Sequence, residues 1–348
     1  MKMNRKAQNL IELIALKANL YPFPSVDAQL MLMLSKAILV AFKLDIFEAA
    51  KDSSQTIEQI ALKTKLHPKG LRSLMNILTS LGYFKYKDGK FGLTKVSKKW
   101  CLKDSRDSVY NHNRYIGSCW DDLMNHLEEY LKTGKGLGIH ETYSEEQWNW
   151  YQLSMEDLAR FTARLASKMA PMPSNPAEML DIGGSHGLYC VELCKRYPTL
   201  KATILELPQS VKKAQPILAK FNMGDRINYW TGNALTDDFG ENRYDLILMS
   251  SLMHHFSAEQ NIKVSKKVAK ALKLGGYFVI QEFLRSETSS KMDQVGIITD
   301  MTFNLTSTSG TWSLNELKDF QEKAGLIHYK VNKFMGLLFF VQVCAKKV

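Results

Sequence analysis

Cysteine, proline and long uninterrupted apolar runs are scarce in this chain of 348 residues. It has five cysteines and nine prolines, and an odd cysteine number without a compact pattern argues against a secreted scaffold held by disulfides. Cys190 and Cys194 lie four residues apart, but no further Cys/His pair at metal-ligand spacing accompanies them. Buried thiols are therefore favoured over a metal site, and we expect no metal.

The chain also lacks a recognisable targeting or membrane-spanning segment. Near the N-terminus the apolar stretch is broken by Glu12 and Lys17, as in an amphipathic helix rather than a signal sequence. The most apolar stretch, 30–44, contains Lys36 and Lys43, which makes it too short and too charged for a bilayer. We therefore expect no membrane partner and a cytoplasmic location.

Acidic residues are few in the first third of the chain. Residues 1–110 carry 19 Lys and Arg against 9 Asp and Glu, whereas the remainder carries 27 against 26. The net charge of +11 therefore comes almost entirely from the first part. A basic N-terminal part raises the hypothesis of nucleic-acid binding, so its local pattern has to be considered.

That basic part contains the pattern of a winged helix. Residues 56–59 (TIEQ) form a capping box that opens a short helix, and Pro68 stands at the first turn of a second helix. Two short apolar segments joined by Asp88-Gly89 then predict a hairpin. The exposed face of the second helix carries a modest set of polar side chains: Lys69, Arg72, Asn76 and Thr79.

A dimerisation module is favoured over a DNA-binding one. The apolar helices expected at 8–20 and 27–44 would lack a core to cover unless a second subunit packs on them. We therefore predict an N-terminal helical and winged-helix dimerisation domain over 1–103, a homodimer, and no nucleic-acid partner. The alternative, a cofactor-sensing DNA-binding regulator, stays open.

A helical layer rich in large side chains is expected over 104–175. Its large residues include Tyr115, Trp120, Trp148, Trp150, Tyr151, Met155, Phe161 and Met169. Such a layer, placed just before a ligand-binding domain, is a plausible wall for a flat organic substrate. Gly134, Gly136 and Gly138 predict a loop, not a phosphate cradle, because no Gly-Lys-Ser/Thr follows them.

Apolar runs and helical stretches alternate over 176–348, as in a sheet built mainly of parallel strands. Strands are expected at 178–182, 202–206, 227–231, 244–250 and 276–282, followed by a hairpin of 329–334 and 337–345 turning at Met335-Gly336. The predicted class is α/β, a Rossmann-like seven-stranded sheet with a terminal antiparallel strand.

The most informative motif is the glycine turn that follows the first of these strands. In LDIGGSHG, Gly183, Gly184 and Gly187 let the chain reverse while a ligand approaches the backbone. Glu206 ends the next strand and can accept both hydroxyl protons of a ribose. A dinucleotide would bring G-x-G-x-x-G, whereas the acid Asp181 before this turn suits an adenosine-bearing ligand with an amino group.

Two histidines and a carboxylate follow later strands at the same edge. His254 and His255 come just after the strand at 244–250, and Glu282 ends the strand at 276–282. A histidine that removes a substrate proton is helped by a carboxylate that holds its other nitrogen protonated. The alternative is that one or both histidines only hydrogen-bond the loop.

Taken together, these motifs resemble one family. The order winged helix, aromatic helices, LDIGGSHG, ILELPQSV, TGNALTDDFG, YDLILMSSLMHHFS, LKLGGYFVIQEF and SGTWSLNELKDFQEKAGL is similar to that of S-adenosylmethionine-dependent O-methyltransferases. The family includes the plant caffeate and flavonoid enzymes and bacterial relatives of secondary metabolism. The resemblance covers residues 25–345.

The resemblance implies a cofactor, S-adenosylmethionine, and roles for particular residues. His254 would be the general base and Glu282 the residue that orients it. Gly183 and Gly184 would approach the methionine part, and Glu206 would hold the ribose. The full set implied for the cofactor is Asp181, Gly183, Gly184, Gly187, Glu206, Leu207, Asn233, Ala234 and Ser250.

Several positions depart from the family pattern. Thr311 stands where a second glutamate would flank the base, and His255 takes the place of an aspartate. Ser185 replaces a glycine, and Ser250 stands where plant members have lysine. The function predicted is methyl transfer to a hydroxyl of a small aromatic molecule, with carbon methylation as an alternative. Phe161, Met301, Phe303 and Trp312 are candidates for the substrate pocket.

Overall fold

The computed structural model divides the chain into two compact units, residues 3–121 and residues 122–348. It describes residues 7, 9–20, 22–285, 294–334 and 337–348. The turn expected at Met335-Gly336 lies outside the described residues. The division of the chain into parts at residues 103 and 175 stays a prediction.

The first unit is helical with one small hairpin. Its elements are α1 (Leu10–Lys17), α2 (Phe23–Lys43), α3 (Ile46–Ala49), α4 (Ile57–Thr64), α5 (Pro68–Ser80), β1 (Phe84–Lys87), β2 (Lys90–Leu93), α6 (Lys95–Trp100) and α7 (Tyr110–Asn125), which continues into the second unit. Thr56 and Gln59 exchange the two hydrogen bonds of a capping box at the start of α4. Asp88 and Gly89, both with positive φ, join β1 to β2 as a tight hairpin turn.

The winged helix has a core of its own. Leu71, Met75 and Leu78 lie on the buried face of α5, and they pack with Phe84 of β1 and Phe91 of β2. This spacing of three and four residues is that of an amphipathic helix laid against a hairpin. The predicted winged helix is therefore present.

Helix α2 is longer than the sequence suggested. It begins at Phe23 rather than near residue 27, and its 21 residues are long and apolar enough to cross a membrane by length and composition. The expectation that this stretch is too short and too charged was therefore wrong. One such helix is weak evidence for a membrane span, because the core helix of a soluble protein and a signal sequence pass the same test of length and composition.

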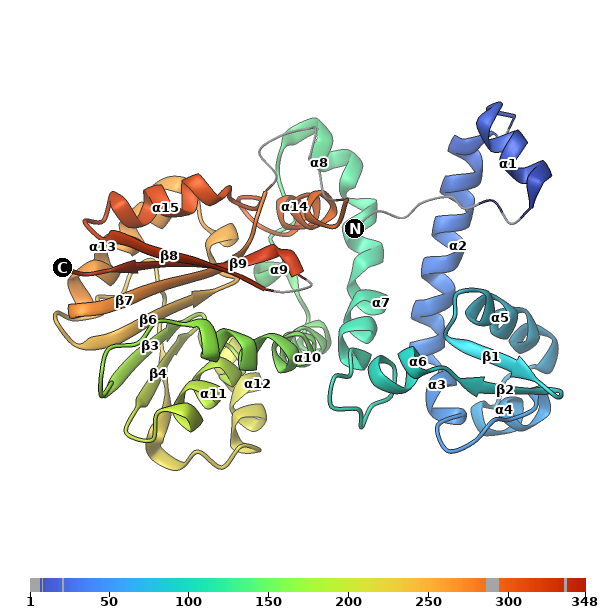
Figure 1. Ribbon diagram of the computed structural model, residues 1–348, viewed down its shortest axis with the longest axis horizontal. Helices are drawn as coiled ribbons and strands as arrows, with labels where there is room; N and C mark the ends of the chain where they lie inside the picture. The colour runs from blue at the N-terminus through green and yellow to red at the C-terminus, as the bar shows by residue number, and fades with distance from the viewer. Residues whose placement is uncertain (1–6, 8, 21, 286–293, 335–336) are drawn as a thin grey trace. The chain divides into compact units, whose positions relative to one another are not determined.

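The second unit is built on a seven-stranded sheet. Its strands are β3 (Glu178–Ile182), β4 (Lys201–Glu206), β5 (Ile227–Thr231), β6 (Tyr244–Ser250), β7 (Leu272–Phe283), β8 (Ile327–Phe334) and β9 (Leu337–Lys346). Their order is β5-β4-β3-β6-β7-β9-β8, and β9 alone runs antiparallel to its neighbours β7 and β8. The predicted fold class is confirmed, with the last strand inserted beside the edge (Figure 1).

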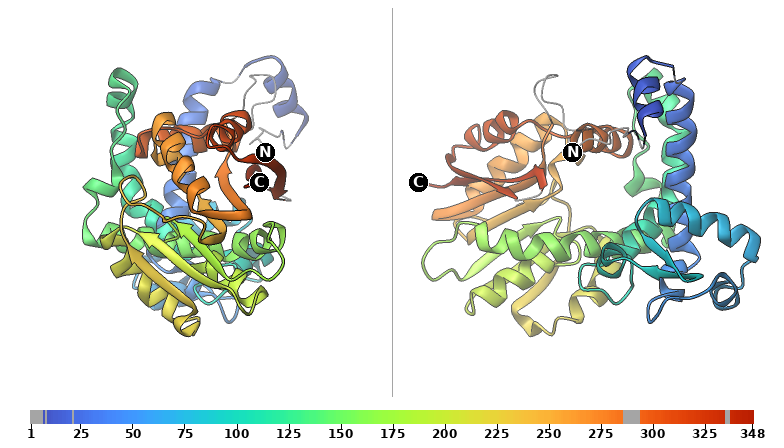
Figure 2. Two further views of the ribbon diagram at one scale, coloured as in Figure 1. Left: turned by 90° about the vertical axis from the view of Figure 1, so that its left-hand side faces the viewer. Right: turned by 45° about the vertical axis from the view of Figure 1, so that its right-hand side comes forward.

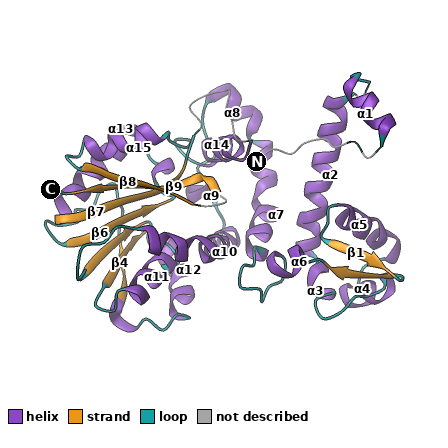
Figure 3. Cartoon of the chain, in the orientation of Figure 1, coloured by secondary structure: helices purple, strands orange, loops and turns teal. Residues whose placement is uncertain are grey.

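Helices cover both faces of this sheet. The helices of the second unit are α8 (Leu127–Thr133), α9 (Ile139–Thr142), α10 (Glu145–Met169), α11 (Leu188–Arg196), α12 (Pro208–Ala219), α13 (Ala258–Ala271), α14 (Gln294–Thr306) and α15 (Leu314–Glu322), with short 3-10 turns η1 (Gly224–Arg226) and η2 (Met253–His255). Met179 packs into the cluster of α10, α11 and α12, whereas the next residue, Leu180, packs into that of α13 and α15. Alternate strand residues therefore fill opposite layers. Figures 2 and 3 show the helices that lie on the two sides of the sheet.

A buried polar row crosses the sheet. Gln281 Nε2 donates to Ser250 Oγ at 2.8 Å, and Gln342 Nε2 donates to Gln281 Oε1 at 3.1 Å. Asn332 Nδ2 completes the row by donating to Gln342 Oε1 at 3.0 Å. A register slip of one residue would leave these groups unpaired in an apolar core, so the row helps to fix the strands that lead to the site.

Candidate active site

The turn between β3 and α11 needs residues without a Cβ. Gly183 and Gly187 have φ angles of 71° and 74°, a left-handed conformation that strains other residues. A Cβ at Gly183 would lie 3.0 Å from the side chain of Leu252. A Cβ at Gly187 would lie 2.8 Å from the side chain of Ile204. The turn therefore presents bare backbone at the carboxyl end of β3, as the predicted cofactor site requires.

Ser185 occupies this turn in place of a glycine and also has a positive φ, 44°. Its hydroxyl donates to Gln152 Oε1 at 2.5 Å, and Gln152 Nε2 donates to Ser210 Oγ at 2.7 Å. Helix α10 therefore ties the turn to α12 through one buried amide. Gln152 has no motif around it, and sequence reasoning missed it.

Asp181 lies beneath the turn rather than at its surface. It is fully buried, its Oδ2 accepts from Cys190 Sγ at 3.3 Å, and its Oδ1 has no hydrogen-bond partner. Burial raises the pKa of Asp181 to about 7, and the nearby charge of Glu206 adds to the increase. This placement differs from that expected of an acid facing a cofactor amino group, and it makes Asp181 a support for the turn.

Glu206 ends β4 with its carboxylate held by backbone. Oε1 accepts from Leu207 N at 2.8 Å and Oε2 accepts from Ser185 N at 3.0 Å. Each oxygen keeps a second lone pair, so the group still fits two ribose hydroxyls. Burial raises the pKa of this carboxyl. The backbone N–H of Gly232 donates to Glu206 O at 3.0 Å, which brings the end of β5 beside it.

Asn233 and Ala234 follow β5 at the same edge. Asn233 Oδ1 accepts from Leu235 N at 2.9 Å, and Ala234 O accepts from Lys267 Nζ at 2.5 Å. These bonds fix a short turn directly beyond the strand end. The residues predicted for the cofactor therefore follow the carboxyl ends of adjacent parallel strands, where such ligands bind in α/β folds.

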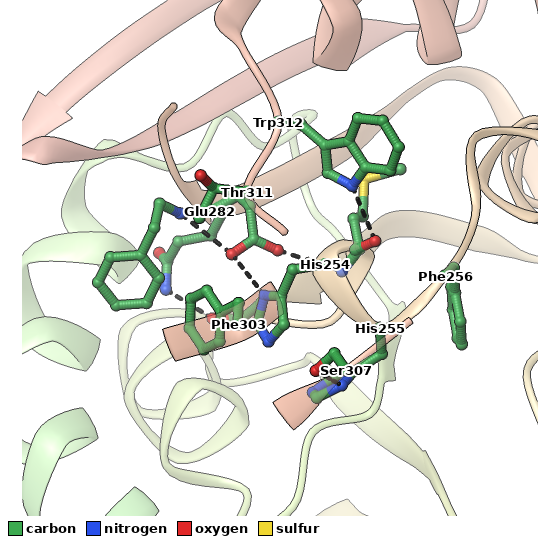
Figure 4. Close-up of polar contacts among 12 residues, drawn as sticks. His254, His255, Phe256, Glu282, Phe303, Ser307, Thr311 and Trp312 are labelled. Carbon is green, nitrogen blue, oxygen red and sulfur yellow. Dashed lines mark hydrogen bonds and ion pairs between the residues drawn. The ribbon is translucent and has the colours of Figure 1, made fainter. Parts of the chain in front are cut away.

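His254 and Glu282 form the hydrogen-bonded pair that the sequence predicted. Nδ1 of His254 lies 3.0 Å from Oε1 of Glu282, and both side chains are buried (Figure 4). Met253 N and Phe283 N also donate to this carboxylate, at 3.1 and 3.0 Å. Phe303 of α14 stacks on the imidazole with a centroid distance of 3.7 Å and an interplanar angle of 12°. The ring is therefore held at one edge and on one face.

His255 points to different partners. Its Nδ1 lies 2.7 Å from Ser307 Oγ (Figure 4). Its Nε2 lies 3.4 Å from Nε2 of His140 on α9. Burial lowers the pKa of His140 to about 4, and burial with the nearby His254 and His140 lowers the pKa of His255 well below its usual range. Both imidazoles are therefore neutral near pH 7. Sequence reasoning missed His140 and Ser307.

Thr311 stands where the resemblance places a second carboxylate. Its backbone N–H and its Oγ1 both donate to Asp300 Oδ1, at 2.8 and 2.6 Å. Arg285 Nη1 donates to Thr311 O at 2.9 Å. A carboxylate therefore does lie beside position 311, but α14 supplies it.

Models of two known domains match the chain. The O-methyltransferase domain matches residues 121–326, and the O-methyltransferase dimerisation domain matches residues 26–103. The chain belongs to the O-methyltransferase family. It is therefore an enzyme that uses S-adenosylmethionine as its methyl donor, as the sequence predicted.

Curated relatives and solved structures extend this assignment. A 3-hydroxy-5-methyl-1-naphthoate 3-O-methyltransferase of Streptomyces sahachiroi is 23% identical over 310 residues, covering 86% of this chain and 88% of that protein. An L-tyrosine C(3)-methyltransferase of Streptomyces lavendulae is 23% identical over 256 residues, covering 69% of each. Human N-acetylserotonin methyltransferase, solved in complex with S-adenosylmethionine, has a TM-score of 0.82 at 17% identity and covers 99% of both chains.

The four side chains predicted to line the substrate pocket of this O-methyltransferase lie in different surroundings. Phe303 contacts His254, and Trp312 Nε1 donates to Met253 O at 2.9 Å, so both touch the histidine segment. Phe161 and Met301 are 38% and 40% exposed, on α10 and α14. Their role in the substrate pocket stays a prediction. The described residues include no group of three or more His, Cys, Asp or Glu that could hold a metal.

Proposed function

We propose that this O-methyltransferase methylates a hydroxyl of a small aromatic molecule, with His254 as general base and Glu282 as the residue that positions it. The observation that carries the proposal is the buried contact between Nδ1 of His254 and Glu282 Oε1 at 3.0 Å. A carboxylate accepts hydrogen bonds, so this contact favours the tautomer with the proton on Nδ1. The lone pair is then on Nε2.

Nε2 of His254 is available to a ligand. Among the described residues it has no hydrogen-bond partner, whereas Nδ1 and one ring face are occupied by Glu282 and Phe303. An acceptor hydroxyl that donates to Nε2 loses its proton there as its oxygen attacks. Glu282, held by two backbone N–H groups, stabilises the imidazolium that results.

The cofactor-binding residues proposed are Gly183, Gly184, Gly187, Glu206, Leu207, Asn233, Ala234 and Ser250, with Asp181 as a support beneath the turn. Bound S-adenosylmethionine supplies a methyl group already activated on a sulfonium. The chain then has to align the acceptor oxygen and remove its proton, and alignment accounts for most of the acceleration. The support for this set is the bare backbone at Gly183 and the carboxylate of Glu206 beyond neighbouring strands.

Aromatic side chains near the histidines support an aromatic acceptor. The ring of His140 lies 5.3 Å from those of Trp148 and Tyr151, and Phe303 covers His254. Flat rings bind between such walls with little loss of side-chain freedom. Carbon methylation, as named for the tyrosine relative, is not favoured because the matching family model is that of O-methyltransferases.

We also propose a homodimer through the N-terminal unit. Its support is the dimerisation match at 26–103 and a row of exposed apolar residues on α2: Leu30, Met31, Leu32 and Met33. A partner helix would remove this apolar surface from water. The DNA-binding alternative is not favoured, because the winged helix falls within the dimerisation match. A cytoplasmic location stays a prediction.

The test is methyl transfer by the purified chain with S-adenosylmethionine and a panel of naphthols and phenols. We expect a mass gain of one methyl and a methyl resonance typical of an aryl ether. A methyl bound to ring carbon in all products would contradict the O-methylation assigned here. His254→Gln should lose transfer, while His328→Phe should retain it. His328 lies on the edge strand β8 beside Ala345, in register with Phe278 near the middle of β7, four residues before Glu282.

A further inference from the structure

His140 is brought to the site by a close backbone approach. The loop before α9 docks on the carboxyl end of α14, where Leu137 N donates to Leu305 O at 2.6 Å. A Cβ at Gly136 would lie 2.7 Å from the backbone oxygens of both Asn304 and Ser307. Only glycine allows this approach, which holds α9 opposite Ser307.

A series of three side chains results. Ser307 Oγ bonds His255 Nδ1 at 2.7 Å, and the Nε2 atoms of His255 and His140 lie 3.4 Å apart. The ring centroids of His140 and His255 are 4.7 Å apart, and those of His255 and His254 are 4.2 Å apart. The series therefore leads directly to the proposed base.

The far end of the series carries an unsatisfied atom. Nδ1 of His140 is fully buried and has no hydrogen-bond partner in the part of the chain that the structure describes. A buried polar atom without a partner costs about 1–3 kcal/mol, so such atoms in native proteins call for an explanation, such as a ligand. The rings of Trp148 and Tyr151 flank this imidazole, each with its centroid 5.3 Å away. The orphan atom therefore lies among aromatic side chains.

The tautomers of the series are coupled. If Ser307 donates to His255 Nδ1, then His255 Nε2 donates to His140 and the proton of His140 is on Nδ1. If Ser307 accepts, both bonds reverse and His140 Nδ1 becomes an acceptor. Either arrangement is neutral, because burial lowers the pKa of both imidazoles. The direction of the Ser307 hydroxyl thus goes with the role of His140 Nδ1 as donor or acceptor. To change from the first arrangement to the second, His255 Nε2 passes its proton to His140 Nε2, His140 Nδ1 releases one proton to solvent or ligand, and His255 Nδ1 takes one up.

We propose that His140 Nδ1 binds a second, uncharged oxygen of the methyl acceptor, a hydroxyl or a carbonyl, and is a specificity-determining residue of this enzyme. The inference rests on the proposed function and adds the class of acceptor, an aromatic with two neutral oxygen substituents. His255 and Ser307 act as positioning residues, because they set the tautomer that His140 presents. Neither would have to touch the acceptor.

The test compares 2-naphthol with 2,3-, 2,6- and 2,7-dihydroxynaphthalene, which differ in the presence and distance of a second oxygen. We expect at least one diol to have a kcat/KM about ten- to a hundred-fold above that of 2-naphthol. In His140→Phe this ratio should fall to near one, and His140→Asn, with a polar atom near the place of Nδ1, should restore part of it. The matched control His328→Phe should keep the full ratio.

Binding separates this inference from the function on which it rests. The affinity of each naphthalene for the full chain saturated with S-adenosylhomocysteine is measured by titration calorimetry, which requires no turnover. A preference for a diol that is lost in His140→Phe supports the inference even if transfer to these probes is absent. Equal affinity for all four compounds, or a preference unchanged in His140→Phe, overturns it. If the parent chain prefers a diol, His140→Phe loses that preference and the parent chain transfers no methyl group, the result would count against the proposed base alone.

Discussion

At the glycine turn, the proposed cofactor end, burial changes the protonation of a carboxyl, Asp181, whereas beside the His254–Glu282 pair, the proposed acceptor end, it changes that of two imidazoles, His140 and His255. Asp181 has its pKa raised to about 7 and so keeps its proton below that pH, while His140 has its pKa lowered to about 4 and is neutral above it. Desolvation is the main cause at both places. One environment, a dry interior, thus removes negative charge from the cofactor end and positive charge from the acceptor end.

The difference has a consequence for how each end responds to pH. An uncharged carboxyl is destabilised by alkali and an uncharged imidazole by acid, so the two ends oppose each other between about pH 4 and pH 7. The free energy of unfolding then changes less with pH than it would with either group alone. Substitutions that affect one end alone should expose the response of the other.

The largest effect is expected at the acceptor end. His254→Gln removes the lone pair proposed to take the acceptor proton, so kcat should fall by about 10²–10⁴ while the affinity for S-adenosylmethionine stays unchanged. Single-turnover rates and cofactor titration by calorimetry measure the two quantities. A parallel loss of cofactor affinity would show that the two ends are not separable.

Asp181→Asn tests the cofactor end. The folded chain keeps a proton that the unfolded chain releases near pH 4, so the stability contributed by Asp181 is lost as pH rises to about 7. An amide of equal size cannot titrate. Relative to the parent chain, the variant should therefore gain about 4 kcal/mol in unfolding free energy between pH 4 and pH 8.

Urea unfolding of both proteins at several pH values between 4 and 8 measures this difference. The matched control is Asp225→Asn, at an exposed position in η1. A difference between Asp181→Asn and the parent chain that does not change with pH would mean that Asp181 is ionised in the folded state.

His140→Phe should change the pH dependence of stability in the direction opposite to that of Asp181→Asn. The unfolded chain protonates this histidine near pH 6.5, whereas the folded chain does so only near pH 4, so stability is lost as pH falls through this range. Removing the histidine should make the chain relatively more stable in acid, by about 3 kcal/mol at pH 4. Thermal unfolding of the variant and the parent chain at pH 4.5 and 7.5 provides the measurement, and a variant that becomes more acid-sensitive would refute the assignment.

The smallest effect is expected where α10 meets the turn. Gln152→Leu leaves the hydroxyls of Ser185 and Ser210 without their shared partner, at a cost of about 1–2 kcal/mol. Ser185→Gly relieves the positive φ and removes one of those hydroxyls, so the double variant should lose less than the sum of the single changes. Additive losses in a double-mutant cycle would mean that the amide does not couple α10 to the turn.

The cofactor end was predictable because it is local. Strands at 178–182, 227–231 and 244–250 were predicted with their observed bounds, and the glycines at 183 and 187 take the left-handed conformations that the turn needs. These features follow from apolar periodicity and turn chemistry within a few residues. Neither depends on how distant helices dock.

The acceptor end was only partly predictable because distant segments form it. His254 and Glu282 lie at or just after the carboxyl ends of neighbouring parallel strands, which meet at one edge of the sheet, so their pairing could be predicted. His140, by contrast, reaches His255 from 115 positions away. Its approach depends on the docking of Gly136 against α14, which no local pattern encodes. Asp300 beside Thr311 is the same case, since residue identity at 311 says nothing of a carboxylate carried by a neighbouring helix.

All five cysteines are buried thiols outside any disulfide: Cys101, Cys119, Cys190, Cys194 and Cys344. Burial raises the pKa of Cys101 and Cys344 to about 12 and that of Cys194 to about 11, which suppresses the reactive thiolate further. A thiol-specific reagent can then react only when the surrounding structure opens. The first two cysteines lie in the N-terminal unit and the other three in the methyltransferase unit. The alkylation rate of each cysteine, followed by mass spectrometry, therefore reports how readily its own unit opens, separately for the two units.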